Sequence, residues 1–435
     1  MDKKKKYPVE GIKNVLIVVL TLSALWLAWE SRLMAPDKEE LPPGQDSTSV
    51  LLPLGGQTEL LHPVRMVANG VGGGGRYGTL YDRSETDALF GQVAGMLMEA
   101  MTEAGPPEKV SRSQWERALT EAPGVFMDFQ GLLPMEVLSG WLYGGNFPGG
   151  DQVRRLLLTV EQTGPALYFK QEDTGVYYRC AARLANPDHM TDVLAGLTDN
   201  GCFYAFETEW AGQLDPDTLF QTGVTALPTY VAANPIPGEQ LVLEGLMAAL
   251  DFSVTGSSFY ASGDELVARN GRDMLRLSHR GTVHYETDDR EAPHFPILSL
   301  GEAGDRFAAA ETCRRILDAV VKPYLGEGSL YLSELDTAGG ETEVVFRYSL
   351  NGVPVYDPRG AAARFLVGER GVTSFDLNVR SYTLDEAAGI VLPPRQAAAA
   401  VDALDLEGRE LLLAYGDQGG ERVAAGWIAA GMERG

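Results

Sequence analysis

Residues 274–286, with the sequence MLRLSHRGTVHYE, decide how the second half of the chain folds. Apolar and polar side chains alternate on both sides of His-Arg-Gly at 279–281, which is the pattern of two strands that each bury one face. Placing the apolar side chains on one face gives two cross-strand pairs, Leu275 with Tyr285 and Leu277 with Val283. The three-residue loop then ends at Gly281, where a left-handed conformation causes no Cβ clash. The segment therefore predicts a β-hairpin with a positive φ at Gly281.

A second copy of this pattern surrounds Glu-Arg-Gly at 369–371. The residues that would share its apolar face are Phe365, Val367, Thr373 and Phe375. We therefore predict a second hairpin, again with a positive φ at the glycine, Gly371. Helical segments are predicted after both hairpins, at 306–321 and 394–404. The last two domains are thus expected to be similar units, each a hairpin followed by a helix.

Other stretches extend the prediction to an α+β fold of antiparallel sheets with packed helices. Helices are predicted at 87–101, 188–197 and 239–250 from their helical spacing of apolar residues. Short strands are predicted at 125–129, 157–160, 166–170 and 176–181. Asn351-Gly352 marks a tight hairpin between 344–350 and 353–356, and a last hairpin joins 411–415 to 423–428.

The beginning of the chain predicts a membrane anchor. Residues 15–29, VLIVVLTLSALWLAW, carry no charge and would rise about 22 Å as a helix, and their flanks extend the span to 15–33. A cleaved signal peptide is the alternative, but Trp26 lies two positions before Ala28 and makes a poor cleavage site. The lysines at 3–6 predict that the N-terminus stays in the cytoplasm and that the bulk of the chain lies outside.

One face of this span carries the small residues Thr21, Ala24 and Ala28. Small residues allow another transmembrane helix to approach closely, so this face is a candidate contact with a second membrane protein. The alternative is that these residues reflect only the ordinary composition of such spans.

Shifts in composition, together with stretches rich in proline and glycine, divide the chain into six predicted segments. These are a basic cytoplasmic tail (1–14), a transmembrane signal anchor (15–33), an extracytoplasmic linker rich in proline (34–60), an N-terminal α+β domain (61–235), a central α+β domain (236–325) and a C-terminal α+β domain (326–435). With 60 acidic and 36 basic side chains, the formal net charge is −24. Such an acidic chain repels phosphate backbones, so nucleic acid is not an expected partner.

No motif in the sequence predicts catalysis or a cofactor. The glycine run at 70–75 lacks the Gly-Lys of a phosphate-binding loop and is interpreted as a hairpin loop. The nucleophile-elbow and zinc-protease motifs are absent. In the hairpin register above, His279 lies in the turn and His284 faces outward beside Arg276, so neither converges with His294, Glu286 and Asp288 on a metal site. We therefore predict no catalytic, metal or cofactor-binding residue.

Two features leave alternatives open. Asp128 lies near the end of the strand-like run VFMDFQG and could be the general acid of a glycan-cleaving enzyme, although a structural role is the usual one for such an acid. Cys180 and Cys202 could form a disulfide outside the cell, or they could be unpaired and buried like Cys313.

Several segments resemble one family. They are IKNVLIVVLTLSALWLAWES (12–31), VFMDFQGLLPMEVLSGWL (125–142), MLRLSHRGTVHYE (274–286), VVFRYSLNGVPVYD (344–357), VLPPRQAAAAVDAL (391–404) and the closing strands at 411–428. With its basic tail and anchor, the chain resembles the YycH regulators and, in its C-terminal third, the related YycI proteins. These are extracytoplasmic partners of the WalK sensor kinase in Gram-positive bacteria.

The resemblance implies no enzymatic activity and provides no catalytic residues. It implies a membrane-anchored regulator of a cell-envelope two-component system, with a sensor histidine kinase and a YycI-like membrane protein as partners. Two other classes stay open: an extracytoplasmic enzyme that acts on the cell wall, and an extracellular ligand-binding module. If the protein is a regulator, its function depends on residues 12–31. If it is an enzyme, a soluble 61–435 fragment is active and one carboxylate is indispensable. If it is a binding module, it has a groove that a small ligand occupies.

Overall fold

The computed structural model describes residues 62–147, 149–236, 240–252, 259–298, 305–403 and 408–430. All of them belong to one compact unit, Leu51–Gly435. The predicted anchor at 15–33 and its contact face of Thr21, Ala24 and Ala28 lie outside the described residues. Among the described helices, none is both long enough and apolar enough to cross a membrane.

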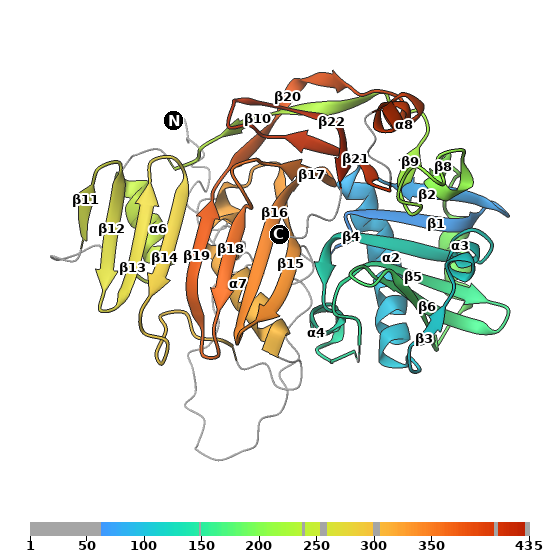
Figure 1. Ribbon diagram of the computed structural model, residues 1–435, viewed down its shortest axis with the longest axis horizontal. Helices are drawn as coiled ribbons and strands as arrows, with labels where there is room; N and C mark the ends of the chain where they lie inside the picture. Colours follow the sequence, from blue (N-terminus) through green and yellow to red (C-terminus); the bar gives the residue numbers. More distant parts are fainter. Residues whose placement is uncertain are drawn as a thin grey trace, which may run out of the picture. The chain divides into compact units, whose positions relative to one another are not determined.

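The first sheet is antiparallel, with the strand order β3–β7–β6–β5–β4–β1–β2 (Figure 1). Its strands are β1 (Arg65–Val71), β2 (Gly75–Thr79), β3 (Glu108–Val110), β4 (Gly124–Leu133), β5 (Val153–Glu161), β6 (Gly164–Gln171) and β7 (Val176–Ala181). The four strands predicted from 125 to 181 are confirmed as β4 to β7, and the glycine run forms the turn between β1 and β2.

Helices cover both faces of the first sheet. Val125 and Met127 of β4 point into the core that contains α2 (Arg83–Thr102), α4 (Met135–Tyr143) and α5 (Asp188–Ala195). Phe126, between them, points to the other face, where Trp115 of α3 (Arg112–Thr120) is fully buried. The strand therefore buries both faces. A small hairpin of β8 (Cys202–Tyr204) and β9 (Leu219–Gln221), with η2 (Ala205–Glu207), follows this part of the chain.

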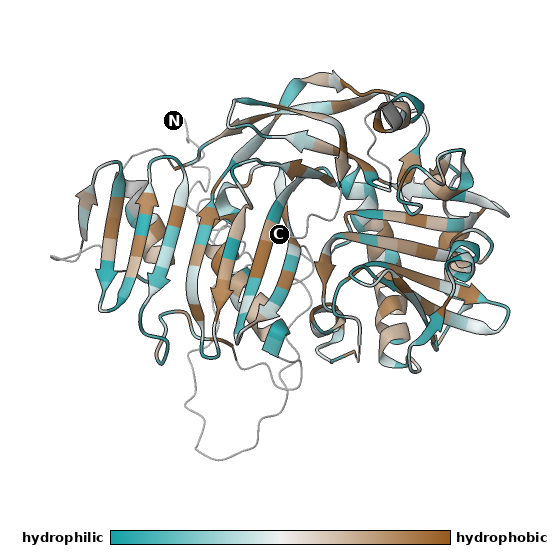
Figure 2. Cartoon of the chain, in the orientation of Figure 1, coloured by the Kyte–Doolittle hydropathy of each residue, from teal (hydrophilic) through white to brown (hydrophobic). Residues whose placement is uncertain are grey.

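The second sheet has the order β11–β12–β13–β14–β19–β18–β16–β15. Its strands are β11 (Phe259–Ser262), β12 (Glu265–Asn270), β13 (Asp273–Ser278), β14 (Thr282–Thr287), β15 (Gly328–Ala338), β16 (Glu341–Leu350), β18 (Ala363–Val367) and β19 (Val372–Asn378). The helices α6 (Gln240–Ala249) and α7 (Asp305–Val320) lie behind this sheet in Figure 1, and η4 (Lys322–Tyr324) ends α7. Figure 2 shows hydrophobic residues along the middle of these strands and hydrophilic residues at their ends.

The hairpin at 274–286 has the predicted register. Leu275 pairs with Tyr285, Leu277 pairs with Val283, and Gly281 has φ +89°. The second hairpin forms as β18 and β19, with Phe365 paired with Phe375.

One detail of the second hairpin was predicted wrongly, because Gly371 does not have a positive φ. At the turn end of this hairpin the register shifts, and Val367 pairs with Val372. Gly371 instead bridges to Pro296, so closely that a Cβ there would lie 2.3 Å from the carbonyl oxygen of Phe295. Glycine is required at this position because the segment at Phe295 and Pro296 packs closely against it, and not because the turn is left-handed.

The third sheet has the order β20–β10–β22–β21, and β17 joins it parallel to β21. Its strands are β10 (Ala226–Ala233), β17 (Val353–Tyr356), β20 (Ser381–Ile390), β21 (Glu410–Gly416) and β22 (Arg422–Ala430). The predicted turn at Asn351-Gly352 joins β16 to β17, with φ values of +49° and +79°, and the predicted last hairpin is β21–β22.

The repeated hairpin–helix unit is found only in part. The hairpin β13–β14 is followed by α7, which packs against β16 of the same sheet. After β18–β19, however, β20 intervenes before α8 (Pro394–Ala403), and Ala397 and Val401 of that helix pack with Trp210 and Leu411 instead. The two hairpins join edge to edge through β14 and β19, so they share one sheet rather than form separate sheets.

Strand pairing runs between the predicted domains. β10 pairs with β20 and β22, and Leu132 of β4 bridges in parallel to Glu334 of β15. The described part of the chain is therefore an α+β fold of linked sheets, and the boundaries at 235/236 and 325/326 stay predictions.

Candidate functional site

The residues considered for chemistry from the sequence have separate structural partners. The ring of His284 contacts Asp376, with 2.7 Å between Nδ1 and Oδ1, and the ring of His294 contacts the carbonyl oxygen of Leu250 at 2.8 Å. His279 lies in the hairpin turn, where its carbonyl oxygen accepts a hydrogen bond from Asn234. Within the described residues, no group of three or more side chains is placed to hold a metal ion.

Asp128 belongs to a buried network of charges. Its carboxylate accepts hydrogen bonds from Arg154 of β5, at 2.7 and 2.8 Å, and from Arg65 of β1. Both arginines also donate to Glu410 of β21, at 3.0 Å from Arg65 and 2.9 Å from Arg154. Burial alone would raise the pKa of Asp128, but Arg154 and Arg65 outweigh it and hold the pKa well below its usual range. An acid that stays ionised cannot donate a proton, so Asp128 is unsuited to be the general acid.

A second buried network lies next to the first. Arg155 contacts Asp217 at 3.1 Å and Glu410 at 3.5 Å, and Trp115 donates to the other oxygen of Asp217 at 3.0 Å. Lys170 lies 3.4 Å from Asp217. Burial opposes the charge of Arg155, yet the surrounding carboxylates keep its pKa well above the usual value. Together the two networks attach the C-terminal hairpin to the first sheet.

The three cysteines are free and buried. Cys180 belongs to the core on the α2 face of the first sheet, whereas Cys202 belongs to the core on the α3 face. Burial raises the pKa of Cys180 to about 11 and of Cys202 to about 12, which makes both thiols poor nucleophiles. Of the two outcomes left open by the sequence, the structure shows unpaired buried cysteines.

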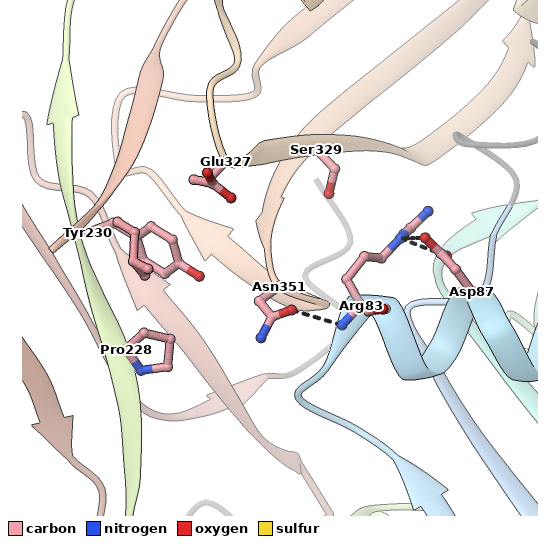
Figure 3. A pocket seen from close by; sticks show the side chains of 9 residues that line it. Arg83, Asp87, Pro228, Tyr230, Glu327, Ser329 and Asn351 are labelled. Carbon is pink, nitrogen blue, oxygen red and sulfur yellow. Dashed lines mark hydrogen bonds and ion pairs between the residues drawn. The ribbon is translucent and has the colours of Figure 1, made fainter. Parts of the chain in front are cut away.

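A cleft of about 610 Å³ opens where α2, the start of β15 and the pair β10–β20 meet (Figure 3). One wall is polar and the other is apolar. The polar wall contains Arg83, Ser84, Asp87, Glu327, Ser329 and Asn351, and the apolar wall contains Pro228, Tyr230 and Leu384. These residues come from all three sheets or the helices packed on them, so only the complete fold forms the cleft.

Asn351 fixes the polar wall. Its side chain accepts a hydrogen bond from the backbone N–H of Arg83 at 2.9 Å and donates one to the carbonyl oxygen of Tyr81 at 3.0 Å. The tight turn at Asn351-Gly352 thereby holds the first turn of α2. Arg83 in turn contacts Asp87 at 2.8 Å, and Asp87 contacts His62 at 2.6 Å. Burial would raise the pKa of Asp87, but His62 and Arg83 lower it, so this carboxylate stays charged and paired.

The apolar wall continues from the core to the surface along β10 and β20. The cross-strand pairs on this face are, in order, Ala232 with Tyr382, Tyr230 with Leu384, Pro228 with Ala388, and Ala226 with Ile390. Tyr382 is fully buried, whereas 61% of Leu384 and 89% of Ile390 are exposed. Tyr230 packs edge-on against Tyr415, with ring centroids 5.2 Å apart. The sheet therefore presents apolar side chains to solvent beside the cleft.

The residues that line the cleft suit ligand binding better than nucleophilic catalysis. Arg83 and Asp87 neutralise each other, Asn351 is occupied by the turn, and the hydroxyl group of Ser329 contacts that of Ser349 at 2.8 Å. No lining hydroxyl has a histidine or a free carboxylate as hydrogen-bond partner among the described residues, which is what nucleophilic catalysis needs.

Comparison with known proteins gives a match at the level of structure. No family model matches the sequence. No curated protein matches it either. The crystal structure of YycH from Bacillus subtilis superposes with a TM-score of 0.54 at 11% sequence identity, covering 86% of this chain and 94% of that chain. This chain has a YycH-like fold. The resemblance seen in the sequence is therefore confirmed at the level of the fold.

Sequence reasoning missed both the cleft and the buried networks. One signal for the networks was present, because Arg154-Arg155 stands at the start of the apolar run of β5, where unpaired charges would be costly. The cleft left no local signal, since its residues span positions 83 to 384.

Proposed function

We propose that the chain is a membrane-anchored extracytoplasmic regulator of a cell-envelope two-component sensor histidine kinase. It acts without catalysis, through contacts of its membrane helix and its ectodomain with the kinase and a YycI-like membrane protein. The observation that carries this proposal is the YycH-like fold over 86% of the chain. The N-terminus is placed in the cytoplasm and residues from about 34 onward outside, on the charge pattern of the sequence.

The buried charges remove one candidate of the enzyme hypothesis. That hypothesis needs an acid that can donate a proton, and Asp128, one candidate for it, is held ionised between Arg65 and Arg154. The cleft of about 610 Å³ favours the ligand-binding module as the second candidate. A small ligand in that cleft would raise the melting temperature of the chain, which a thermal-shift screen measures.

The proposal is tested by photocrosslinking from position 21 of the membrane helix, on the same face as Ala24 and Ala28, in cells. We expect the crosslinker to capture a sensor histidine kinase. Replacing both Ala24 and Ala28 with leucine keeps the helix apolar but blocks close approach, at about 1–2 kcal/mol, or roughly tenfold weaker association. The matched control replaces Val15 and Val19, on other faces, with leucine, and should leave capture and signalling unchanged.

Two outcomes would contradict the proposal. The first is capture that contains no kinase while expression of the chain is normal. The second concerns topology: a reporter that is active only outside the cytoplasm should work when fused after residue 60. Activity from a cytoplasmic reporter alone at this position would reverse the orientation and exclude the regulator.

A further inference from the structure

Among the described residues, the outer edge of β20 has no strand partner along most of its length. At its start, Tyr382 exchanges backbone hydrogen bonds with the 325–327 segment, at 3.1 and 2.8 Å. From 383 to 390, β20 pairs with β10 on its inner side, and no described residue hydrogen-bonds to the backbone of its outer edge. An unpaired edge of this kind is a template for a further strand.

Exposed hydrophobic side chains gather on the same strand and just beyond it. Among the described residues, the large hydrophobic side chains that are most exposed include Leu384 (61%), Ile390 (89%) and Leu392 (53%). Leu384 and Ile390 share the face that continues from the core through Tyr230. Scattered exposed apolar residues need no explanation, but a row beside an open strand edge indicates a binding surface.

A bulge divides this edge. Residues 385–387 lie opposite Thr229 alone, and Asp385 is turned inward to Thr229 and to Arg422 at 2.9 and 3.3 Å. A charged side chain that faces solvent at a strand edge discourages a further strand from adding there. Asp385 does not have this role, because its carboxylate is paired on the inner side of β20. The stretch 387–390 beyond the bulge stays extended and carries Ala388 and Ile390 on its apolar face.

The charges around the outer edge of β20 indicate what kind of partner would bind there. Glu386 is exposed on the strand, and Glu327 lines the cleft that Leu384 also lines. A second copy of this chain would bring a second acidic edge against this one, and like charges on directly opposed strands are unfavourable. The chain as a whole has a charge of −24, which also disfavours self-association and anionic lipid.

We propose that the outer edge of β20 binds an extended segment of another protein, in which apolar residues alternate with lysine or arginine. The segment adds as a strand along 387–390, its apolar side chains cover Ile390 and Leu384, and a basic side chain enters the cleft towards Glu327. This mode of recognition takes affinity from main-chain hydrogen bonds and specificity from alternate side chains. The inference goes beyond the proposed function, because it concerns the folded unit and holds whichever protein supplies the segment.

The test uses the full chain and a fluorescent ten-residue peptide of alternating valine and lysine. We expect saturable binding by fluorescence anisotropy, and slower amide hydrogen exchange at 387–390 when the peptide is bound. A peptide N-methylated at consecutive residues has both edges blocked, so it cannot pair as a strand and should bind at least tenfold more weakly, as should a peptide of alternating valine and glutamate.

Variants of the chain locate the site. Ile390→Ser with Leu384→Ser should weaken binding at least tenfold, and Glu327→Gln should weaken it several-fold and reduce its dependence on salt. The matched control is Tyr260→Ser, which removes a side chain 44% exposed on another edge strand, β11, and should leave binding unchanged. All these positions are exposed, and unchanged circular dichroism confirms folding.

Three outcomes overturn the proposal. They are no binding at 1 mM peptide (on the order of the weakest specific complexes), equal binding of the N-methylated peptide, and binding that survives the double serine variant. A chain that is dimeric by light scattering and becomes monomeric with Ile390→Ser would also overturn it, because a second copy would then cover the edge.

Discussion

Replacing Glu410 with glutamine is expected to destabilise the folded chain by roughly 3 kcal/mol at pH 7. In the fold, burial raises the pKa of Glu410, but the charges of Arg154 and Arg65 outweigh burial and lower it from 4.5 to about 2. At about 1.4 kcal/mol for each pKa unit, the ionised carboxylate contributes roughly 3 kcal/mol to the free energy of unfolding. The glutamine leaves both buried arginines short of one counter-charge, for which about 3–5 kcal/mol is typical.

The pH dependence has a definite sign. Because the pKa is lower in the folded state than in the unfolded state, the stabilisation is complete well above pH 4.5 and is lost as the pH falls towards 2. The difference in the free energy of unfolding between the wild-type chain and Glu410→Gln should therefore shrink over this range. Urea unfolding followed by tryptophan fluorescence, repeated between pH 7 and pH 3, measures it.

A matched control uses the same substitution at an exposed ion pair. Glu343 pairs with Arg364 on the open face of the second sheet, where their side chains are 36% and 51% exposed. Glu343→Gln should cost less than about 1 kcal/mol at pH 7. Equal costs for Glu410→Gln and Glu343→Gln, or a cost at Glu410 that does not change with pH, would refute the argument from the buried network.

Three further predictions follow from single contacts. Gly371→Ala should destabilise the chain by about 1–3 kcal/mol in urea unfolding, because the new Cβ would lie 2.3 Å from the carbonyl oxygen of Phe295; a neutral result would contradict this close approach. Asp376→Asn should lower the pKa of His284 in an NMR titration, since the hydrogen bond that His284 donates to Asp376 raises that pKa; because the raised pKa stabilises the fold only at low pH, the variant should match the wild-type stability above the folded-state pKa. Asn351→Ala should cost about 1–2 kcal/mol, because it removes both hydrogen bonds that hold the start of α2; an unchanged melting temperature would show that the turn does not support the helix.

The parts of the fold that could be predicted are those that short stretches of sequence encode. The hairpin at 274–286 has its predicted register because strict alternation allows one pairing only and Gly281 marks the turn. The turn at Asn351-Gly352 was also predicted correctly, because this dipeptide by itself favours a tight hairpin turn. The role of Asn351 in holding α2 was not, because its partners lie about 270 positions earlier.

The missed elements depend on contacts between distant segments. The sequence of β20, SYTLDEAAGI, contains residues that are rare in strands, and β10 contains Pro228, so each is a strand because it pairs with the other. Gly371 has the sequence context of a left-handed turn, but the approach of Phe295 gives it another role. The cleft is lined by residues of a locally encoded turn and by residues of β10 and β20, which are strands only because distant segments pair. Local sequence patterns therefore could not predict it.

The hydrogen bond between Arg65 and Glu410 joins residues 345 positions apart. A ribosome that makes this chain completes Arg65, Asp128 and Arg154 long before it reaches Glu410, so the nascent first sheet holds two arginines with a single carboxylate between them. Folding that waits for distant partners is slow and exposes unpaired strand edges meanwhile. A message truncated before codon 410 therefore yields a protein in which the buried Arg65 and Arg154 share Asp128 alone, and proteases should remove it even though most of its strands are present.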